Sequence, residues 1–434
     1  MNVIEGQKLN KSMDNIIVRK DKGNRGIKGN NSTGIVLDNE IFSKHILAIG
    51  SIGSGKTNLM NHIVKFILSD IKENDIVVFF DAKGDYLKEF YRDGDIVIGD
   101  EHKFGEKYNV QHWNLFKDIQ YSPVEERLES AREITTSIFK QYIDNSQSPN
   151  FLMGARDILT SLIISSLRAM DRGASAWDNE KLKNRLNKWT IEDIKKRTNQ
   201  YEDLKWASSY LMNEGSATTQ SYISPLYMVA QEVFVGPFAK SGNFSMREAI
   251  REKGGKSIFL EYDITRGNLL KPMYTVLLDL AMKEALGRND KGGNVYFILD
   301  EFPLIPKLSY IDNALNFGRS LGVKVLAGIQ NVGQVEHTYT ESMATSLMSG
   351  FSTMFAFKLF DEKSRHMISQ RYGKNRTLTS VISSNSHKGI NDSILDTNVI
   401  EDWDITTLNV GQCIVSMLNE EPFIFNPVKY EERE

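Results

Sequence analysis

The stretch "ILAIGSIGSGKTNLMNHIVKFIL", Ile46 to Leu68, decides the fold. It begins with an apolar run typical of a buried strand, passes through a glycine-rich turn, and ends with helical periodicity. Its centre fits the pattern G-x-x-x-x-G-K-[ST] in the strand–loop–helix context that a phosphate-binding loop requires. Backbone N–H groups in such a loop turn inward and, with the N-terminus of the helix, form an anion-binding concavity. The stretch therefore predicts a nucleotide site.

The loop is expected to hold ATP together with Mg²⁺. Lys56 would reach the β- and γ-phosphates, and the Thr57 hydroxyl would bind the metal ion. The residues expected to contact the nucleotide are Gly50, Ser51, Gly53, Ser54, Gly55, Lys56, Thr57 and Asn58.

A second motif, "VYFILDEF", ends at Phe302 and is an apolar strand that delivers two carboxylates to its C-terminal end. Ligands of open α/β sheets bind at that end of the strands. Asp300 is expected to hold Mg²⁺ through water, as a Walker-B aspartate does. Glu301 is expected to be the general base that polarises the attacking water. Should the base lie elsewhere, Asp81 and Asp85 of "FFDAKGDYLKEF" are the next candidates.

Two further polar residues flank another apolar strand in "NFGRSLGVKVLAGIQNVGQ". Gln330 follows the strand, where a glutamine can orient water or sense the γ-phosphate. Arg319 precedes the strand, so it is suited to reach the γ-phosphate of a neighbouring subunit. By spacing alone, Arg319 is equally an ordinary surface arginine and Gln330 an ordinary turn residue.

Composition bounds the partners and the compartment. The chain has 434 residues and a formal net charge of −3, so binding to nucleic acid must come from local patches. The single cysteine, Cys413, rules out disulfides within the chain and cysteine-rich metal sites. No signal peptide opens the chain and no apolar run approaches the length of a membrane span, which predicts a cytoplasmic protein.

The order of patterns predicts four parts. Short β elements and a lysine- and arginine-bearing turn occupy residues 1–33, and the turn is either a solvated hairpin or a phosphate-contacting loop. Strand–helix–strand patterns, typical of an α/β fold with a mostly parallel twisted sheet, occupy residues 34–123 and return over 251–434. Helical periodicity dominates residues 124–250, which predicts an inserted all-α domain.

The order of motifs resembles the type IV coupling proteins, the conjugative DNA-transfer ATPases of the TraG/TraD type. The matching segments run from about Gly34 to Tyr430 and are "GSIGSGKT", "FFDAKGDYLKEF", "YNVQHWNLF", "FILDEFPLIP", "GRSLGVKVLAGIQNVGQ" and "LNVGQCIVSMLNEEPF". Leu115 stands where the family usually has proline. The resemblance implies a RecA-like P-loop NTPase with an inserted all-α domain, with Arg319 as a finger acting in trans and Gln330 as a γ-phosphate sensor.

The resemblance also implies partners: DNA held by its phosphates, a relaxase or other cargo protein, and a membrane-anchored transfer channel. It implies a homo-hexameric ring when active, with a monomer expected in isolation. Family members usually carry transmembrane helices ahead of the nucleotide-binding domain, and no such segment is evident here. Peripheral attachment to the inner face of the membrane would then require a partner. Two alternatives stay open: a HerA- or FtsK-like DNA pump in repair, segregation or defence, and a nucleotide-gated adaptor that recruits cargo without pumping.

Overall fold

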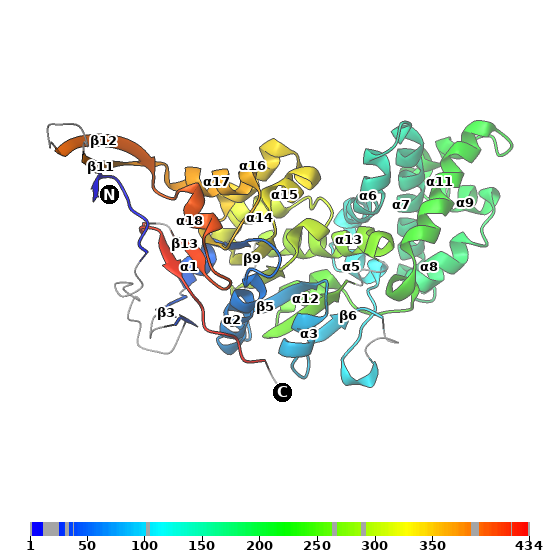
Figure 1. Cartoon of the computed structure of the whole chain (residues 1–434). Helices are drawn as coiled ribbons and strands as arrows, with labels where there is room; N and C mark the ends of the chain where they lie inside the picture. Colours follow the sequence, from blue (N-terminus) through cyan, green and yellow to red (C-terminus); the bar gives the residue numbers. More distant parts are fainter. Residues whose placement is uncertain are drawn as a thin grey trace. The chain divides into compact units, whose positions relative to one another are not determined.

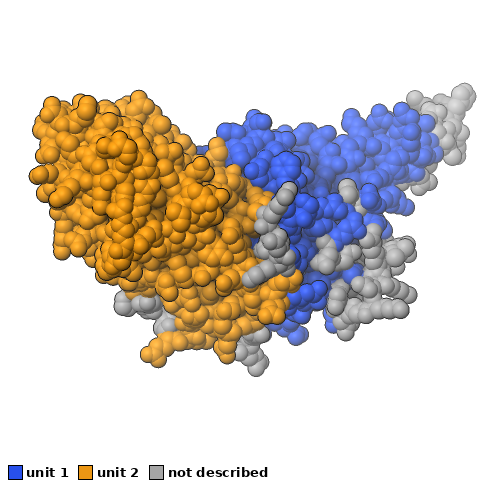
Figure 2. Space-filling view, turned by 180° about the vertical axis from the view of Figure 1, so that it is seen from behind, with its two compact units in different colours: residues 1–72, 292–304, 311–434 blue, residues 73–291, 305–310 orange. Residues whose placement is uncertain are grey.

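The computed structural model describes residues 2–11, 26–30, 34–37, 39–100, 105–262, 267–287, 292–382, 390–417 and 419–432. The chain divides into two compact units, each assembled from separate stretches of sequence (Figure 2). Unit 1 comprises residues 1–72, 292–304 and 311–434, and unit 2 comprises residues 73–291 and 305–310.

A mostly parallel sheet forms the centre of unit 1, with strand order β14-β13-β10-β4-β9-β8. β10, β4, β9 and β8 run parallel, whereas β13 and β14 pair antiparallel at the edge. Nearly every residue of these strands is buried, as expected where both faces of a sheet are covered. The strands are β4 (Ile46–Ile49), β8 (Val295–Leu299), β9 (Val323–Ile329), β10 (Thr353–Ala356), β13 (Cys413–Ser416) and β14 (Phe423–Phe425).

Helices alternate with these strands along the chain (Figure 1). The helices of unit 1 are α1 (Asn39–Ser43), α2 (Lys56–Ser69), α14 (Ile311–Phe317), the 3₁₀ turn η8 (Gly318–Leu321), α15 (Val332–Tyr339), α16 (Glu341–Gly350), α17 (Glu362–Tyr372) and α18 (Asp402–Thr406). Alternation of strands and helices with parallel strands is the α/β arrangement that the sequence predicts.

A second sheet of unit 1 was not predicted from the sequence. β11 (Lys374–Ile382) and β12 (Ile390–Asn398) form a long antiparallel ribbon, and β1 (Asn2–Glu5) pairs with β11 (Figure 1). In the N-terminal segment, β2 (Ile27–Lys28) pairs antiparallel with β3 (Gly34–Ile35). Most of the basic turn predicted near these strands lies outside the described residues.

Unit 2 combines three parallel strands, in the order β5-β7-β6, with a group of helices. The strands are β5 (Ile76–Asp81), β6 (Ile96–Ile98) and β7 (Lys256–Glu261). The helices are α3 (Asp85–Phe90), α5 (Leu115–Gln120), α6 (Arg127–Asp144), α7 (Pro149–Asp171), α8 (Asn179–Leu186), α9 (Ile191–Thr198), α10 (Lys205–Ser208), α11 (Ala217–Val233), α12 (Met246–Glu252) and α13 (Gly267–Leu286).

Helix α7 is the centre of the helical part of unit 2 and packs against α6, α9, α10 and α11. The buried hydroxyls of Thr160 in α7 and Thr135 in α6 lie 2.7 Å apart and bond the two helices. All of residues 124–250 are described, and they contain helices and no strand. The α/β fold is thus as predicted, while the exact domain boundaries stay a prediction.

Candidate nucleotide-binding site

The phosphate-binding loop is fixed between two neighbouring strands of unit 1. It leaves the C-terminal end of the buried strand β4, which lies between β9 and β10. The Gly50 N–H donates to the Ile329 carbonyl at 3.2 Å, and the Ser51 N–H donates to the Lys358 carbonyl at 3.0 Å. The two strands on either side of β4 therefore hold the start of the loop in place, through the end of β9 and the residues that follow β10.

Gly55 closes the loop at the N-terminus of α2. Its φ of 113° lies in the left-handed region, and a Cβ at this position would lie 2.9 Å from the Gly411 Cα. The Gly411 N–H donates to the Ser54 carbonyl at 2.9 Å. The loop before β13 thus supports the phosphate-binding loop. Resemblance to the family includes this segment in "LNVGQCIVSMLNEEPF", but no local pattern predicts a role for it.

Lys56 and Thr57 occupy the first turn of α2. Lys56 is buried, and its Nζ donates to the Gly50 carbonyl and, at 3.2 Å, to the Ser51 carbonyl. The ammonium therefore already lies over the loop whose backbone would receive a phosphate. The Ser54 hydroxyl is buried beside it with no hydrogen-bond partner among the described residues. An orphaned donor next to a buried ammonium fits an anion in this loop.

Asn58 is a partial exception to the predicted nucleotide contacts. Its amide Nδ2 donates to the Val428 carbonyl at 3.0 Å, and its Oδ1 accepts from the Tyr430 N–H at 2.7 Å. The Asn58 side chain is therefore bonded to the C-terminal segment, so that only the Asn58 backbone N–H could still serve a phosphate.

Asp300 follows β8 directly and is buried. The neighbouring strand makes room for it, because a Cβ at Gly328 would lie 2.1 Å from the Asp300 carbonyl oxygen. The parallel register sets Leu299 beside Ala327, so that Asp300 and Gly328 come next in their strands. The glycine of "AGIQ" is thus required by the close approach of the end of β8.

Glu301 and Gln330 come from different strands and meet at the same edge of the sheet. The Gln330 Nε2 donates to the Glu301 Oε2 at 3.3 Å, and both side chains are half-buried. A carboxylate oriented by an amide is a suitable arrangement for positioning and activating a water molecule. Their roles stay a prediction, while their proximity is a feature of the fold.

Arg319 does not join this group within the chain. It is exposed in η8, just before β9, whereas the loop contacts Ile329 at the other end of that strand. β9 has seven residues and spans roughly 20 Å. That separation exceeds the reach of an arginine side chain, so Arg319 cannot complete the site of its own chain in this structure.

The two carboxylates of "DAKGD" in unit 2, Asp81 and Asp85, lie at the end of β5 and at the start of α3. Asp81 accepts the backbone N–H groups of Gly84 at 2.8 Å and of Leu87 at 2.9 Å, which fixes the turn into α3. Burial raises the pKa of Asp81, and these hydrogen bonds oppose the rise. Asp85 is exposed in the first turn of α3. Neither observation favours them as the base in place of Glu301.

The "HWNLF" segment is also structural. Asn114 caps α5, and its Nδ2 donates to the Gly242 carbonyl at 3.0 Å. The Leu115 N–H donates to the Asn179 Oδ1 at 3.1 Å. Proline at position 115 could not make this last bond, because it has no N–H. The departure from the family pattern therefore adds a link between α5 and α8.

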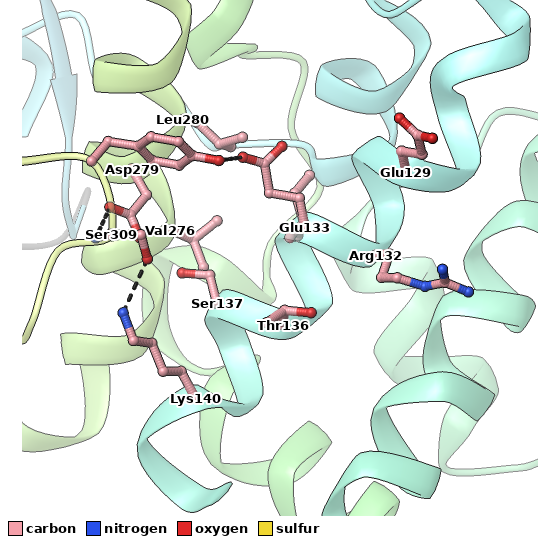
Figure 3. Close-up of a pocket in the computed structure, with 12 residues that line it drawn as sticks. Glu129, Arg132, Glu133, Thr136, Ser137, Lys140, Val276, Asp279, Leu280 and Ser309 are labelled. Atoms are coloured by element: carbon pink, nitrogen blue, oxygen red, sulfur yellow. Dashed lines mark hydrogen bonds between the residues drawn. The ribbon is translucent and has the colours of Figure 1, made fainter. Parts of the chain in front are cut away.

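The chain that leaves Glu301 enters unit 2 through residues 305–310, where α6 and α13 hold it. The Ser309 N–H donates to the Asp279 Oδ1 at 2.7 Å, the Lys140 Nζ donates to the Ser309 hydroxyl at 3.0 Å, and the Tyr310 hydroxyl donates to the Glu133 Oε1 at 2.6 Å (Figure 3). These side chains line a cavity of about 340 Å³. Burial raises the pKa of Asp279 to about 6. No sequence motif pointed to this cluster.

A polar, lysine-rich segment of unit 2, "DRGASAWDNEKLKNRLNKW" (residues 171–189, hereafter the lysine-rich connector), is only partly available to a partner. The Lys181 Nζ donates to the Ser175 hydroxyl and, at 2.8 Å, to the Ala176 carbonyl, and it lies 4.9 Å from the Trp177 ring centre. Lys188 is exposed on the same surface. A binding face of this connector would therefore depend more on Lys188 than on Lys181.

Comparison with known proteins adds the family. Residues 30–415 match the family described as the type IV secretion-system coupling protein DNA-binding domain. The chain belongs to this family. The coupling protein TraD of Escherichia coli (strain K12) is 21% identical over 343 residues, a match that covers 75% of this chain and 42% of TraD. The chain thus spans less than half the length of that relative.

Solved structures of a conjugative coupling protein share the fold. The unbound monoclinic form of TrwBdeltaN70 aligns with a TM-score of 0.74 at 18% identity, covering 95% of this chain and 90% of the other. TrwB in complex with ADP and Mg²⁺ aligns with a TM-score of 0.74 at 17% identity, covering 100% and 97%. The predicted family and the RecA-like α/β fold are therefore confirmed. Over the described ranges, no helix of this coupling protein is long and apolar enough to cross a membrane.

Proposed function

We propose that the chain is an ATP-hydrolysing motor that moves DNA into a conjugative transfer channel. The observation that carries the proposal is the meeting of Lys56, Asp300 and the Glu301–Gln330 pair at one end of the parallel strands of unit 1. The chain that carries these residues belongs to the coupling protein family, which supports DNA as the substrate. The TrwB structure with ADP and Mg²⁺, which shares this fold, supports the choice of nucleotide and metal.

Each residue has a distinct part in the proposed reaction. Lys56 and the N-terminus of α2 bind the β- and γ-phosphates, while Thr57 and Asp300 would hold Mg²⁺. When bound, the metal ion neutralises charge on the phosphates. Glu301 takes the proton of the attacking water, and Gln330 holds Glu301 and the water in line.

The site is completed by a second copy of the chain. Arg319 is exposed and lies beyond reach of its own loop, so we assign it to the neighbour's γ-phosphate in a ring, a homo-hexamer by analogy with the family. DNA would be gripped by phosphate contacts, which are independent of sequence and sensitive to salt. A relaxase or other cargo and a membrane-anchored channel would be the protein partners, at the inner face of the membrane.

The test is ATPase rate measured across protein concentration, with single-stranded and double-stranded DNA. A rate per subunit that rises with concentration and with DNA is expected of a ring motor. A DNA-independent rate would favour the nucleotide-gated adaptor. Lys56→Ala should abolish turnover, because the phosphate charge loses its main compensation.

Mixing two inactive variants tests the trans assignment of Arg319. Arg319→Ala should bind ATP normally and lose on the order of 10³- to 10⁵-fold in turnover. Lys56→Ala retains the arginine and Arg319→Ala retains the loop, so mixed rings should regain activity at some junctions. If confirmed mixed rings stay inactive at high concentration with DNA, the trans assignment is wrong.

A further inference from the structure

The C-terminal segment is fastened along the outer side of the phosphate-binding helix α2. The Val428 carbonyl accepts from the Asn58 Nδ2 at 3.0 Å and lies 2.9 Å from the His62 Nε2. The Tyr430 N–H donates to the Asn58 Oδ1 at 2.7 Å. Both polar ends of the Asn58 amide are thus satisfied by backbone groups of one segment that is distant in sequence.

The tyrosine of this segment adds a packed contact one turn farther along α2. Tyr430 is buried, its ring meets the His62 ring edge-on at 5.2 Å between centres, and the Lys65 Nζ lies 5.3 Å from the ring centre. An aromatic pair of this kind is worth about 0.5–1.5 kcal/mol beyond the area it buries. The segment is therefore attached to α2 at three successive positions of one helix face.

The same segment is anchored on its other side. The Val428 N–H donates to the Lys28 carbonyl at 3.0 Å, and the Asn30 N–H donates to the Asn426 carbonyl at 2.9 Å. Residues 426–430, hereafter the strap, therefore run between the β2 strand and α2. The strap thus connects α2 to the segment around β2. Contacts to α2 alone would not make this connection.

Asn58 directly follows Lys56 and Thr57 in the first turn of α2. The hydrogen bonds of its side chain therefore constrain the position of that turn. Asparagine is an unfavourable residue within a helix, and its amide would otherwise compete for local backbone groups. Alanine or leucine would suit the helix better if only helix formation mattered. The hydrogen bonds to the strap explain why asparagine occupies this helix position.

We propose that Asn58 is a positioning residue, which with the strap sets the first turn of α2 so that Lys56 and Thr57 face the phosphates and the metal ion. The inference rests on the proposed nucleotide site and deepens it. Because linkage is reciprocal, bound nucleotide should also hold the strap more firmly on α2. A partner that displaced the C-terminal segment would then lower the affinity for nucleotide.

The test uses the full chain and a matched control on the same helix. Asn61 is half-buried on α2, and its side chain makes no hydrogen bond to the described residues, so Asn61→Ala is the control for Asn58→Ala. The measurements are the Kd for a fluorescent ATP analogue with Mg²⁺, and kcat and KM for ATP. We expect Asn58→Ala to raise Kd and KM by about 5- to 20-fold with kcat within about twofold, and Asn61→Ala to change neither.

A second pair of measurements keeps the proposal testable if Asn58→Ala folds poorly. His62→Ala and Tyr430→Ala loosen the strap without changing the first turn of α2, and they should weaken nucleotide binding by a smaller factor. In wild type, nucleotide should slow proteolytic removal of the strap. Wild-type affinity in well-folded strap variants overturns the positioning role alone. Failure of wild type to bind Mg-ATP overturns the proposed function itself.

Discussion

Glu301 in unit 1 and Asp118 in unit 2 are carboxylates with opposite surroundings. Glu301 is half-buried beyond the C-terminal end of β8 and accepts a 3.3 Å hydrogen bond from the Gln330 side chain. Asp118 is fully buried and accepts from the Ser245 hydroxyl at 2.6 Å, the Arg247 N–H at 2.9 Å and the Trp113 ring N–H. Burial raises the pKa of Asp118, and its hydrogen bonds oppose the rise.

The number of fixed donors around each carboxylate separates a structural role from a reactive one in this protein. Asp118 lies in α5 and receives donors from Trp113, which precedes that helix, and from the N-terminus of α12, so it links two helices through residues 127 positions apart in sequence. Saturation by fixed donors leaves little capacity for a substrate proton. A perturbed pKa alone would direct attention to Asp118, whereas geometry directs it to Glu301.

The largest effect expected of this comparison is on turnover. Glu301→Gln should bind Mg-ATP yet lose on the order of 10²- to 10⁴-fold in kcat, because an amide cannot take the proton of water. Single-turnover hydrolysis and nucleotide affinity measure the two parts separately. Asp85→Asn, an exposed carboxylate after β5, is the control and should hydrolyse ATP normally. Normal hydrolysis by Glu301→Gln would place the base elsewhere.

The next effect is on stability rather than on chemistry. Asp118→Ala leaves several buried donors without an acceptor, each worth about 1–3 kcal/mol, so the free energy of unfolding should fall by about 4 kcal/mol. Urea unfolding followed by tryptophan fluorescence measures it, since four of the five tryptophans lie in unit 2. Glu192→Ala, an exposed helix position, should cost little. A stable Asp118→Ala protein with lost turnover would reverse the comparison.

Asp279 should make the stability of unit 2 depend on pH. Its pKa is raised by burial from 3.8 to about 6, so the folded state binds more protons than the unfolded chain between these values. The free energy of unfolding should therefore fall by up to about 3 kcal/mol as pH rises from about 4 to about 6. Asp279→Asn should remove this slope, and Glu129→Gln at the exposed rim should leave it. An unchanged slope in Asp279→Asn would assign it to another group.

The smallest effect concerns the lysine-rich connector. Lys188→Glu should weaken binding of DNA by a few-fold, with basal ATPase unchanged. The slope of log affinity for DNA against log salt concentration should fall by about one, as for the loss of one phosphate contact. Lys181→Glu should instead destabilise the connector, because Lys181 is bonded to the Ser175–Trp177 turn. Binding titrations at two salt concentrations separate the outcomes. Equal DNA affinity in Lys188→Glu would mean a solvated surface.

The sequence was sufficient where short segments carry both the element and the chemistry. The apolar runs before Gly50 and Asp300 predict buried strands, and parallel strands bring their C-terminal ends together, which is why Glu301 and Gln330 meet. Local pattern could not reveal partners distant in sequence: Tyr430 bonds Asn58 across 372 positions. The β11–β12 ribbon could not be predicted because its sequence interleaves polar and apolar residues without an apolar run.

The attachment of residues 305–310 to unit 2 has a consequence for recombining relatives of this protein. A chimera that exchanges only residues 73–291 would pair α6 and α13 of one parent with Ser309 and Tyr310 of the other. Asp279 and Glu133 would then depend on foreign donors at 2.7 Å and 2.6 Å. A chimera that transplants unit 2 intact must therefore exchange two separate segments, residues 73–291 and residues 305–310.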